Sequence, residues 1–487
     1  MCFYEQKAGL REQPFLIDDR GVTVTYGQLN EFCSCFSKAV EKRKLAFLLC
    51  TNTAGSVLGY TACLRHKVVP LLLDVKIDES LFLALTEVYD PDYLYVPDRG
   101  ADWTTKCAKE TETVFYKYGY RMIKRRPKQK TMLYEELALL LTTSGSTGSP
   151  KLVRQSYKNI TANAKAIAEY LGLHAKERPV TVLPMHYTYG LSVINSHMEA
   201  GAAILLTARS LFEKEFWEFF RKEEGTSISG VPFTYEMLWK LGFMDMDLPS
   251  LKTMTQAGGK LSLKLHHSFA AYAENTGKNF IVMYGQTEAT ARMSYLPAAD
   301  SLKKPGSIGI AIPGGTFRLI ETEQGRQKEI VEPLTEGELF YEGANVTLGY
   351  AKTKEDLLRG DERQGCLATG DIAVRDRDGF YYITGRKKRF LKILGNRVNL
   401  DEAEQLLKNR YPNLECACSG RDDQMDIFLA GELKPPEEQI RDFLSGKTKL
   451  NPSVFHIYTI PEIPKTSAGK ILYGELKESY VHTDDLC

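Results

Sequence analysis

The 487-residue sequence lacks an excess of charge of either sign and any long apolar run. Its 63 Lys and Arg residues nearly balance 62 Asp and Glu residues, so the formal net charge is +1. Nucleic-acid-binding proteins usually carry a basic excess or stripe, and here only short basic clusters occur, at 124–130 and 386–389. No apolar stretch approaches the roughly 18 residues of a membrane helix, and residues 1–13 carry charges where a signal peptide needs an apolar core. We therefore expect a cytoplasmic protein with no membrane insertion and no nucleic-acid partner.

The sequence also lacks the common short signatures of metal and nucleotide sites. Its ten cysteines include no C-x-x-C pair and its eight histidines no H-E-x-x-H, which argues against a zinc site and favours free thiols. We find no G-x-G, so a Rossmann fingerprint is absent. The P-loop pattern G-x-x-x-x-G-K also fails, because Pro150 stands five residues after Gly145.

Short apolar runs alternate with amphipathic stretches between residues 44 and 285. The apolar runs predict strands at 45–50, 68–75, 179–185, 202–207, 227–231, 251–257 and 279–285. The stretches between them predict helices, among them 54–66, 212–225 and 261–277. This alternation predicts an α/β fold with parallel sheets covered by helices, in which ligands bind beyond the carboxyl ends of the strands.

The pattern changes beyond residue 300. Apolar and polar residues alternate between Gly turns over 314–350, which predicts a β-rich module. The last hundred residues predict a small α/β unit, with helices at 400–410 and 436–445 and strands near 414–419, 425–431 and 453–459. We place a domain boundary near residue 387, which gives an N-terminal domain of residues 1–387 and a C-terminal domain of residues 388–487.

The loop TSGSTGSPK, residues 143–151, is rich in Ser, Thr and Gly and ends in a lysine. Exposed backbone N–H groups and short hydroxyls of this kind cradle phosphate oxygens, and glycines let the backbone approach a ligand closely. The same composition is typical of a flexible linker. Composition alone leaves both interpretations open.

Five segments in a fixed order resemble the motifs of the AMP-forming adenylating enzymes, which include acyl- and aryl-CoA synthetases, luciferases and nonribosomal peptide synthetase adenylation domains. The segments are TSGSTGSPK (143–151), QAGGKL (256–261), MYGQTEA (283–289), the run 368–404 and PKTSAGKI (464–471). The resemblance implies that ATP activates a fatty or aryl carboxylic acid as an acyl-adenylate, with release of pyrophosphate. Transfer to the thiol of coenzyme A or of a carrier-protein phosphopantetheine then gives a thioester. It also implies that residues 1–387 bind ATP and acid and that residues 388–487 form a mobile lid.

The resemblance assigns roles to individual residues. It makes Lys470 the catalytic lysine, Glu288 the ligand of Mg²⁺, Thr287 a donor to the α-phosphate and Arg386 a ribose and phosphate contact. Tyr284 would stack on adenine, and the Asp371 carboxylate would accept both ribose hydroxyls. The nucleotide-binding set implied in this way is Thr143, Ser144, Gly145, Ser146, Thr147, Gly148, Lys151, Gly258, Gly259, Tyr284, Gly285, Asp371 and Arg386.

The hinge and the acyl pocket follow from the same resemblance. Lys388 occupies the hinge position, and Gly395 resembles the glycine that lets the pantetheine arm pass. The candidate acid pocket comprises His186, Tyr187, Tyr189, Val231 and Phe233. Most family members have a histidine where this sequence has Tyr187, so the roles of His186 and Tyr187 stay open, and both also suit a protein core. The segment offers no carboxylate for a substrate ammonium, which disfavours an α-amino acid.

Alternative functions also stay open at this point. One is a non-catalytic nucleotide-binding protein on the same fold, although the joint presence of Lys470, Glu288, Asp371 and Arg386 argues against it. Another is an acyl-AMP ligase that loads only an acyl carrier protein, and a third is a luciferase-like oxygenating activity.

Overall fold

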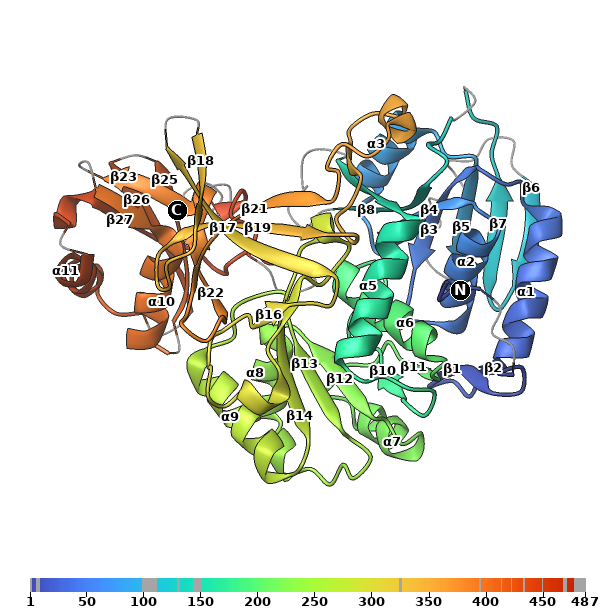
Figure 1. Ribbon diagram of the computed structural model, residues 1–487, viewed down its shortest axis with the longest axis horizontal. Helices are drawn as coiled ribbons and strands as arrows, with labels where there is room; N and C mark the ends of the chain where they lie inside the picture. Colours follow the sequence, from blue (N-terminus) through green and yellow to red (C-terminus); the bar gives the residue numbers. More distant parts are fainter. Residues whose placement is uncertain are drawn as a thin grey trace. The chain divides into compact units, whose positions relative to one another are not determined.

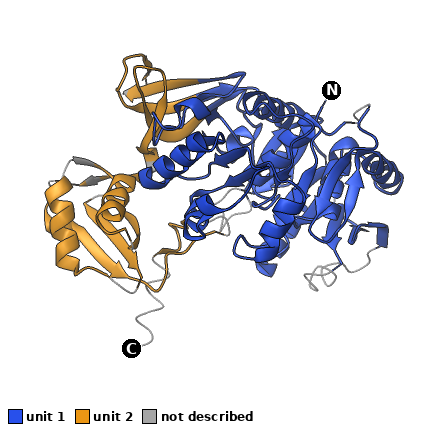
Figure 2. Cartoon of the chain, turned by 90° about the horizontal axis from the view of Figure 1, so that it is seen from below, with its two compact units in different colours: residues 1–316, 341–367 blue, residues 317–340, 368–487 orange. Residues whose placement is uncertain are grey.

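The computed structural model describes residues 2–5, 9–98, 112–128, 132–142, 151–323, 326–393, 396–412, 414–421, 423–431, 434–448, 450–466 and 471–476. The chain divides into two compact units (Figure 2). Unit 1 comprises residues 1–316 and 341–367, and unit 2 comprises residues 317–340 and 368–487. The boundary near residue 387 lies inside unit 2 and stays a prediction.

Unit 1 contains two large sheets. The first has the strand order β16-β15-β14-β13-β12-β10-β11-β1-β2. Its strands are β1 (Pro14–Asp18), β2 (Thr23–Thr25), β10 (Pro179–Val180), β11 (Ile204–Leu206), β12 (Ser227–Gly230), β13 (Thr253–Gln256), β14 (Asn279–Tyr284), β15 (Ser294–Tyr295) and β16 (Ile310–Ala311). The strands from β1 to β14 in this order pair in parallel, whereas β2, β15 and β16 pair antiparallel at the edges.

The second sheet of unit 1 has the order β20-β9-β8-β4-β3-β5-β7-β6. Its strands are β3 (Leu45–Cys50), β4 (Val69–Asp74), β5 (Tyr93–Pro97), β6 (Glu112–Lys117), β7 (Tyr120–Lys124), β8 (Leu137–Thr142), β9 (Leu152–Ser156) and β20 (Gly349–Ala351). Its centre is parallel and its edges are antiparallel. The predicted α/β fold is therefore confirmed, but both sheets are mixed, because hairpins extend each parallel centre.

The helices of unit 1 cover these sheets. They are α1 (Tyr26–Ala39), α2 (Ala54–Arg65), α3 (Glu79–Tyr89), α5 (Tyr157–Tyr170), α6 (Thr188–Ala200), α7 (Lys214–Lys222), α8 (Pro232–Lys240) and α9 (Leu263–Asn275). Capping boxes at Thr25 and Ser156 start α1 and α5. Helices α5 and α6 lie between the two sheets (Figure 1), and one apolar core joins Ile160 of α5 and Ile194 of α6 to both of them. In the described parts of the chain, no helix is long and apolar enough to cross a bilayer.

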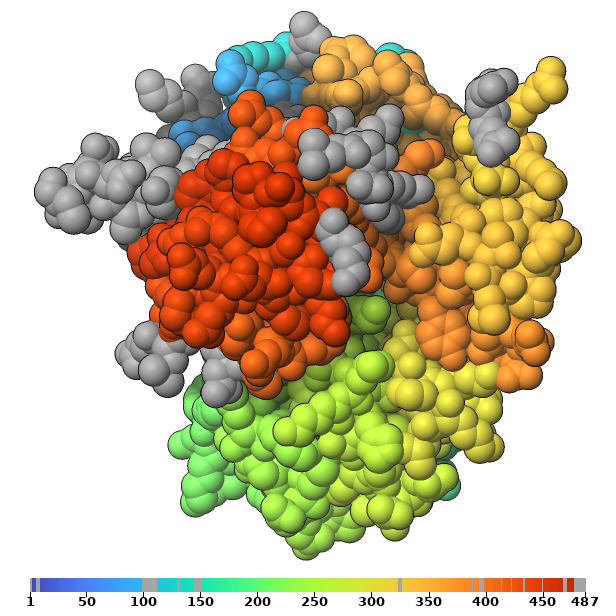
Figure 3. Space-filling model, turned by 90° about the vertical axis from the view of Figure 1, so that its left-hand side faces the viewer, coloured from blue at the N-terminus to red at the C-terminus, as the bar shows by residue number. Residues whose placement is uncertain are grey.

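Unit 2 begins with the predicted β-rich module, a sheet of order β18-β17-β19-β21-β22. Its strands are β17 (Gly315–Glu323), β18 (Arg326–Ile330), β19 (Gly337–Gly343), β21 (Cys366–Arg375) and β22 (Tyr381–Arg386). The C-terminal residues follow as β23 (Phe390–Ile393), β24 (Asn396–Asn399), α10 (Leu400–Arg410), β25 (Glu415–Arg421), β26 (Gln424–Ala430), α11 (Glu437–Thr448) and β27 (Phe455–Thr459). They gather into one compact body, red in Figure 3, around a core that includes Leu407, Ile427 and Leu444.

Candidate active site

The motifs of unit 1 follow the carboxyl ends of three neighbouring parallel strands. Val231 follows β12, Gly258 and Gly259 follow β13, and the segment 285–290 follows β14. The pairings of β12 with β13 and of β13 with β14 bring these ends to one edge of the sheet. That edge is where ligands bind in α/β folds.

The backbone of Glu288 is fixed from a distant segment of the chain. Its carbonyl oxygen accepts hydrogen bonds from the backbone N–H of Thr347 at 3.0 Å, the Thr347 hydroxyl at 2.9 Å and Nη1 of Arg363 at 2.9 Å. The Glu288 carboxylate accepts a further bond through Oε1 from the Tyr350 hydroxyl at 2.7 Å. The acid of the Y-G-x-T-E motif is thus held in one orientation by residues about sixty positions downstream.

Two cations lie against the ring of Tyr350. Nζ of Lys151 is 3.3 Å from the ring centroid, and the guanidinium carbon of Arg363 is 4.6 Å from it. Burial, and then the charge and hydrogen bond of Glu288, raises the pKa of Tyr350 to about 12. Tyr350 therefore keeps its proton at neutral pH and stays a donor to Glu288. This arrangement combines one carboxylate with two cations, as a site for a metal-bound polyphosphate requires.

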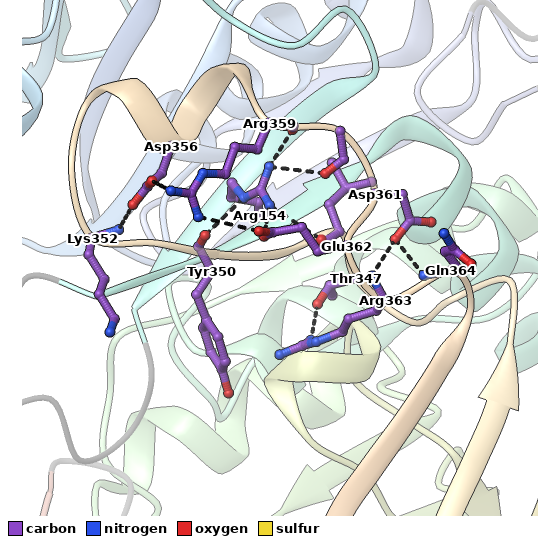
Figure 4. Close-up of polar contacts among 12 residues, drawn as sticks. Arg154, Thr347, Tyr350, Lys352, Asp356, Arg359, Asp361, Glu362, Arg363 and Gln364 are labelled. Carbon is purple, nitrogen blue, oxygen red and sulfur yellow. Dashed lines mark hydrogen bonds and ion pairs between the residues drawn. The ribbon is translucent and has the colours of Figure 1, made fainter.

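Arg154 anchors Tyr350 from the opposite side. It is fully buried, and it donates through Nε to the Tyr350 carbonyl at 3.1 Å and through Nη2 to the Leu348 carbonyl at 3.3 Å. It also bonds the Glu362 carboxylate and the Arg359 carbonyl, whereas the Tyr350 ring points away from it (Figure 4). An open groove of about 620 Å³ runs along this segment; it is lined by Gly349, Tyr350, Lys352, Thr353, Glu355, Asp356, Arg359, Glu362 and Arg363.

The turn after β14 depends on two unusual backbone positions. A Cβ at Gly285 would lie 1.7 Å from the carbonyl oxygen of Ala291, so the turn itself requires glycine there. Thr290 has φ +67°, a strained value for a β-branched residue. Its hydroxyl donates to the Asn345 carbonyl at 2.6 Å, and its own carbonyl accepts from the Thr188 hydroxyl at 2.6 Å. These bonds hold the conformation that places Thr287 and Glu288.

The other described residues of unit 1 that are predicted to bind the nucleotide lie on the same edge of the sheet. Tyr284 ends β14, and its hydroxyl accepts a bond from Nε2 of Gln286 at 3.3 Å. Thr287 begins the 3-10 turn Thr287–Ala289. Gly258 has φ +84°, and a Cβ there would lie 2.8 Å from the Tyr187 hydroxyl. Residues 143–148, predicted to bind phosphate, lie outside the described residues.

The candidate acid segment is divided between core and surface. Tyr189 is buried and donates to the carbonyl of Thr255 at 3.0 Å. Val231 packs in the same apolar cluster, which Tyr187 joins as a partly buried member. His186 lies 3.7 Å from the Asp74 carboxylate, and burial lowers its pKa while Asp74 opposes that shift. Phe233, on the first turn of α8, is half exposed. The predicted strand 179–185 ends at Val180, because the chain turns there and the Val182 N–H bonds the Val180 carbonyl.

In unit 2, Asp371 and Arg386 face each other across β21 and β22. Nε of Arg386 donates to Oδ1 of the buried Asp371 carboxylate at 2.9 Å. The two residues predicted to contact ribose are therefore neighbours, although fifteen positions separate them. Lys388 lies in the 3-10 turn Lys387–Arg389 that follows β22.

Two predicted residues of unit 2, Gly395 and Lys470, lie outside the described residues. Ile471, which follows Lys470, forms an antiparallel bridge with Lys465. Arg389 is engaged within unit 2, where it bonds the carboxylates of Asp401 and Glu404 and lies 3.8 Å from the Tyr473 ring centroid.

Glu288 suits a hard cation that arrives with a nucleotide. Of its two carboxylate oxygens, only Oε1 accepts a hydrogen bond from the described residues, which leaves Oε2 for a metal. Within the same part of the chain no cluster of three His, Cys, Asp or Glu side chains occurs. A cation here would therefore need phosphate oxygens and water as its other ligands, as Mg²⁺ does in nucleotide sites.

Comparison with solved structures defines the fold. The o-succinylbenzoate CoA synthetase of Bacillus subtilis with its acyl-adenylate intermediate matches with a TM-score of 0.79 at 23% identity, covering 98% of this chain and 97% of that one. MatB of Rhodopseudomonas palustris with bound ATP matches with a TM-score of 0.76 at 19% identity, covering 99% of each chain. The same Bacillus subtilis synthetase has also been solved with ATP and magnesium ion. The fold is that of the adenylating enzymes.

Sequence comparison then gives the family. The family model of AMP-binding enzymes matches residues 3–351, so the chain belongs to the AMP-binding enzyme family. A 2-succinylbenzoate–CoA ligase of Bacillus cytotoxicus is 26% identical over 375 residues, 74% of this chain and 75% of that protein. An oxalate–CoA ligase of Arabidopsis thaliana is 28% identical over 347 residues, 69% of this chain and 66% of that protein. The prediction of an AMP-forming ligase-type enzyme is confirmed at the level of the family.

Sequence reasoning missed Tyr350, Arg363 and Arg154. Tyr350 ends the segment GANVTLGY, whose only pattern is the alternation of apolar and polar residues that predicts strands. Arg363 lies in a charged stretch without a pattern. Only the folded structure brings these residues together, because β20 pairs with β9 through Gly349 and Arg154.

Proposed function

We propose that this protein uses ATP to activate a carboxylic acid and then transfers the acyl group to a thiol. In the first step a carboxylate oxygen attacks the α-phosphorus of ATP, the bond to the bridging oxygen breaks, and pyrophosphate leaves. In the second step a thiol attacks the acyl carbon, and AMP and a proton are released. Atoms and charge balance in both steps without any oxidant or reductant.

The arrangement of Glu288, Tyr350 and Lys151 carries this proposal. A carboxylate and an α-phosphate are both anions, so the first step needs positive charge fixed in advance. Lys151 and Arg363 supply such charge beside Tyr350, and Glu288 is oriented to hold Mg²⁺ on the phosphates. When bound, Mg²⁺ neutralises charge that develops on the departing pyrophosphate. The protein itself orients Glu288, since Thr347 and Arg363 hold its carbonyl oxygen by hydrogen bonds.

Further roles are assigned to residues of unit 2. Asp371 accepts the ribose hydroxyls, and Arg386, paired with it, contacts ribose and phosphate. Lys470 contacts both the acid and the α-phosphate. Rotation at Lys388 of a lid formed by residues 388–487 then exchanges Lys470 for the thiol-binding face, with Gly395 beside the pantetheine arm.

The acyl acceptor and the acid are proposed by class. The acceptor is coenzyme A or a carrier-protein phosphopantetheine, and relatives named CoA ligases favour coenzyme A. The acid is fatty or aryl, because Tyr187, Val231 and their neighbours form an apolar cluster. The names of the relatives include 2-succinylbenzoate, oxalate and long-chain fatty acid, so they support no single choice.

ATP–pyrophosphate exchange tests the proposal. The full-length chain is incubated with ATP, Mg²⁺, labelled pyrophosphate and a panel of fatty, aryl, dicarboxylic and amino acids. We expect label to enter ATP only when an accepted acid is present. Addition of coenzyme A or a phosphopantetheinylated carrier protein then identifies the acceptor by thioester formation. Absence of exchange with every acid would contradict the proposal.

A further inference from the structure

Arg292 is a buried cation that has no counter-ion among the described residues. Its side chain lies in unit 1, between Glu288 and β15, and the residue is 3% exposed. Nη1 donates to the Tyr170 hydroxyl at 3.2 Å, and the guanidinium carbon lies 5.1 Å from the ring centroid of Tyr189. Nε donates to no acceptor, and among the described residues no carboxylate lies within ion-pair distance of it.

Arg154, which is also buried, shows the contacts of an arginine with a structural role. Arg154 donates to the carbonyls of Tyr350 and Leu348 and forms an ion pair with Glu362. A buried charge that lacks such partners destabilises the fold strongly. Arg292 has a neutral hydroxyl and an aromatic face instead. Its unpaired Nε–H donor and its positive charge could therefore both be satisfied by a bound anion.

The surroundings of Arg292 belong to the candidate acid site. Tyr189 packs with Val231, Ala257 and Met283 in the cluster that Tyr187 joins. Tyr170, the acceptor of the Arg292 bond, belongs to the same cluster and stacks on Tyr295 with a centroid distance of 4.2 Å. The guanidinium therefore lies against two tyrosine rings of that apolar cluster.

The backbone of Arg292 is fixed relative to Glu288. Its carbonyl accepts from Nδ2 of Asn163 at 2.8 Å and from Nδ2 of Asn345 at 3.2 Å. Asn345 also donates to the carbonyl of Ala289, the residue after Glu288. One short segment thus carries the carboxylate of the proposed phosphate site and, four residues later, a cation directed into the apolar cluster.

We propose that Arg292 binds a second carboxylate of the acid substrate, and that the protein therefore prefers dicarboxylic acids. This inference rests on the proposed function. One carboxylate of the substrate reacts with ATP, and the other pairs with the guanidinium of Arg292. Tyr170 positions the guanidinium, and Tyr189 covers its face. Bidentate pairing of arginine with a carboxylate gives both charge compensation and orientation.

Matched pairs of acids test the preference. ATP–pyrophosphate exchange is measured with hexanoate against adipate, and with benzoate against isophthalate, for wild type, Arg292→Gln and Arg292→Lys. We expect wild type to favour one diacid over its monoacid partner, and Arg292→Gln to reduce that ratio about 10- to 100-fold, the scale of a buried charge-assisted hydrogen bond. Arg292→Lys keeps the charge and should retain part of the preference. The exposed Arg221→Gln is the matched control and should leave the ratio unchanged.

Binding provides a second readout that does not depend on turnover. The melting temperature of each variant is measured with and without the preferred diacid, and Arg292→Gln should lose the shift that wild type shows. The diacid assignment would be overturned if wild type used monoacids as well as diacids and Arg292→Gln left the ratio of the two exchange rates unchanged. That result would leave the proposed function intact. Exchange with no acid at all would overturn both.

Discussion

At the residue scale, the proposed binding of Mg²⁺ depends most on the negative charge of Glu288. Glu288→Gln keeps the shape of the side chain and its bond with Tyr350 but removes the carboxylate that would hold Mg²⁺. We expect ATP–pyrophosphate exchange to fall about 100-fold and the Mg²⁺ concentration for half-maximal rate to rise. A Mg²⁺ titration of the exchange rate measures both. Glu274→Gln, at an exposed position of α9, is the control, and an unaltered titration for Glu288→Gln would refute the metal role.

Lys470 is proposed to act in only one half-reaction. Lys470→Ala should reduce adenylation at least about 100-fold, the scale for loss of one preorganised charge. Thioester formation from supplied acyl-adenylate should be much less affected, because the proposed rotation removes the lysine from the site before that step. Lys465→Ala, which removes an ion pair with Glu415 on the exposed surface, serves as the control. Equal losses in the two half-reactions would argue against the assignment.

Residues inside contiguous motifs could be predicted, whereas residues joined only by folding could not. Glu288, Asp371 and Arg386 stand in recognisable segments, so the sequence alone is enough to propose them as site residues. Tyr350 reaches Glu288 across 62 positions, and nothing in its own segment indicates that contact. Arg292 follows the Y-G-x-T-E motif at a position without a pattern, and only its burial without a counter-ion reveals it.

At the scale of the elements, Asn345 links the turn after β14 to the segment before β20. Its side chain donates to the carbonyls of Ala289 and Arg292 and accepts from the Tyr341 hydroxyl. Asn345→Ala leaves these buried groups unpaired, which should lower the free energy of unfolding by about 1–3 kcal/mol and reduce exchange. Denaturant unfolding together with the exchange rate measures both effects. Asn275→Ala, on exposed surface, should stay within about 0.5 kcal/mol, and a similar result for Asn345→Ala would contradict the linking role.

The sequence predicted the positions of helices and strands better than it predicted which strands pair with one another. The runs predicted at 45–50 and 400–410 coincide with β3 and α10, because buried apolar periodicity is a local property. The order of the sheets is not local. The pairing of β20 with β9 joins residues almost 200 positions apart, and the hairpin of β6 and β7 extends a parallel sheet with antiparallel strands.

At the scale of the whole molecule, a buried histidine links stability to pH. His197 of α6 is 3% exposed, and burial, assisted by Arg292, lowers its pKa to about 4. The unfolded chain protonates this residue near its ordinary value of about 6.5 and so binds more protons below that pH. Stability should therefore fall as pH drops from about 6.5 towards 4, by about 2 kcal/mol at pH 5 from this group alone.

Comparison with His197→Gln isolates that contribution. The free energy of unfolding is measured at pH 7 and pH 5 for both proteins, and the difference between the two pH values is compared. Wild type should lose about 2 kcal/mol more than the variant over this interval. Because each protein is its own reference, an overall destabilisation of His197→Gln does not affect the result. Equal losses in both proteins would contradict the assignment.

The distribution of the candidate site residues over the two units is also a property of the whole chain. Unit 1 contains Glu288 and the apolar cluster around Tyr189, whereas unit 2 contains the Asp371–Arg386 pair and the turn Lys387–Arg389 that is proposed as a hinge. The sequence places a domain boundary near residue 387, which stays a prediction. In the structure residues 317–340 and 368–386 belong to unit 2, since they form one sheet that precedes the C-terminal body.

The central claim is that a carboxylate attacks the α-phosphorus of ATP, and an oxygen label tests it most directly. The accepted acid is prepared with ¹⁸O in its reacting carboxylate and incubated with the enzyme, ATP, Mg²⁺ and the thiol acceptor. The masses of AMP and pyrophosphate are then measured. We predict one ¹⁸O atom in AMP and none in pyrophosphate. Unlabelled AMP, or label in pyrophosphate, would contradict the account.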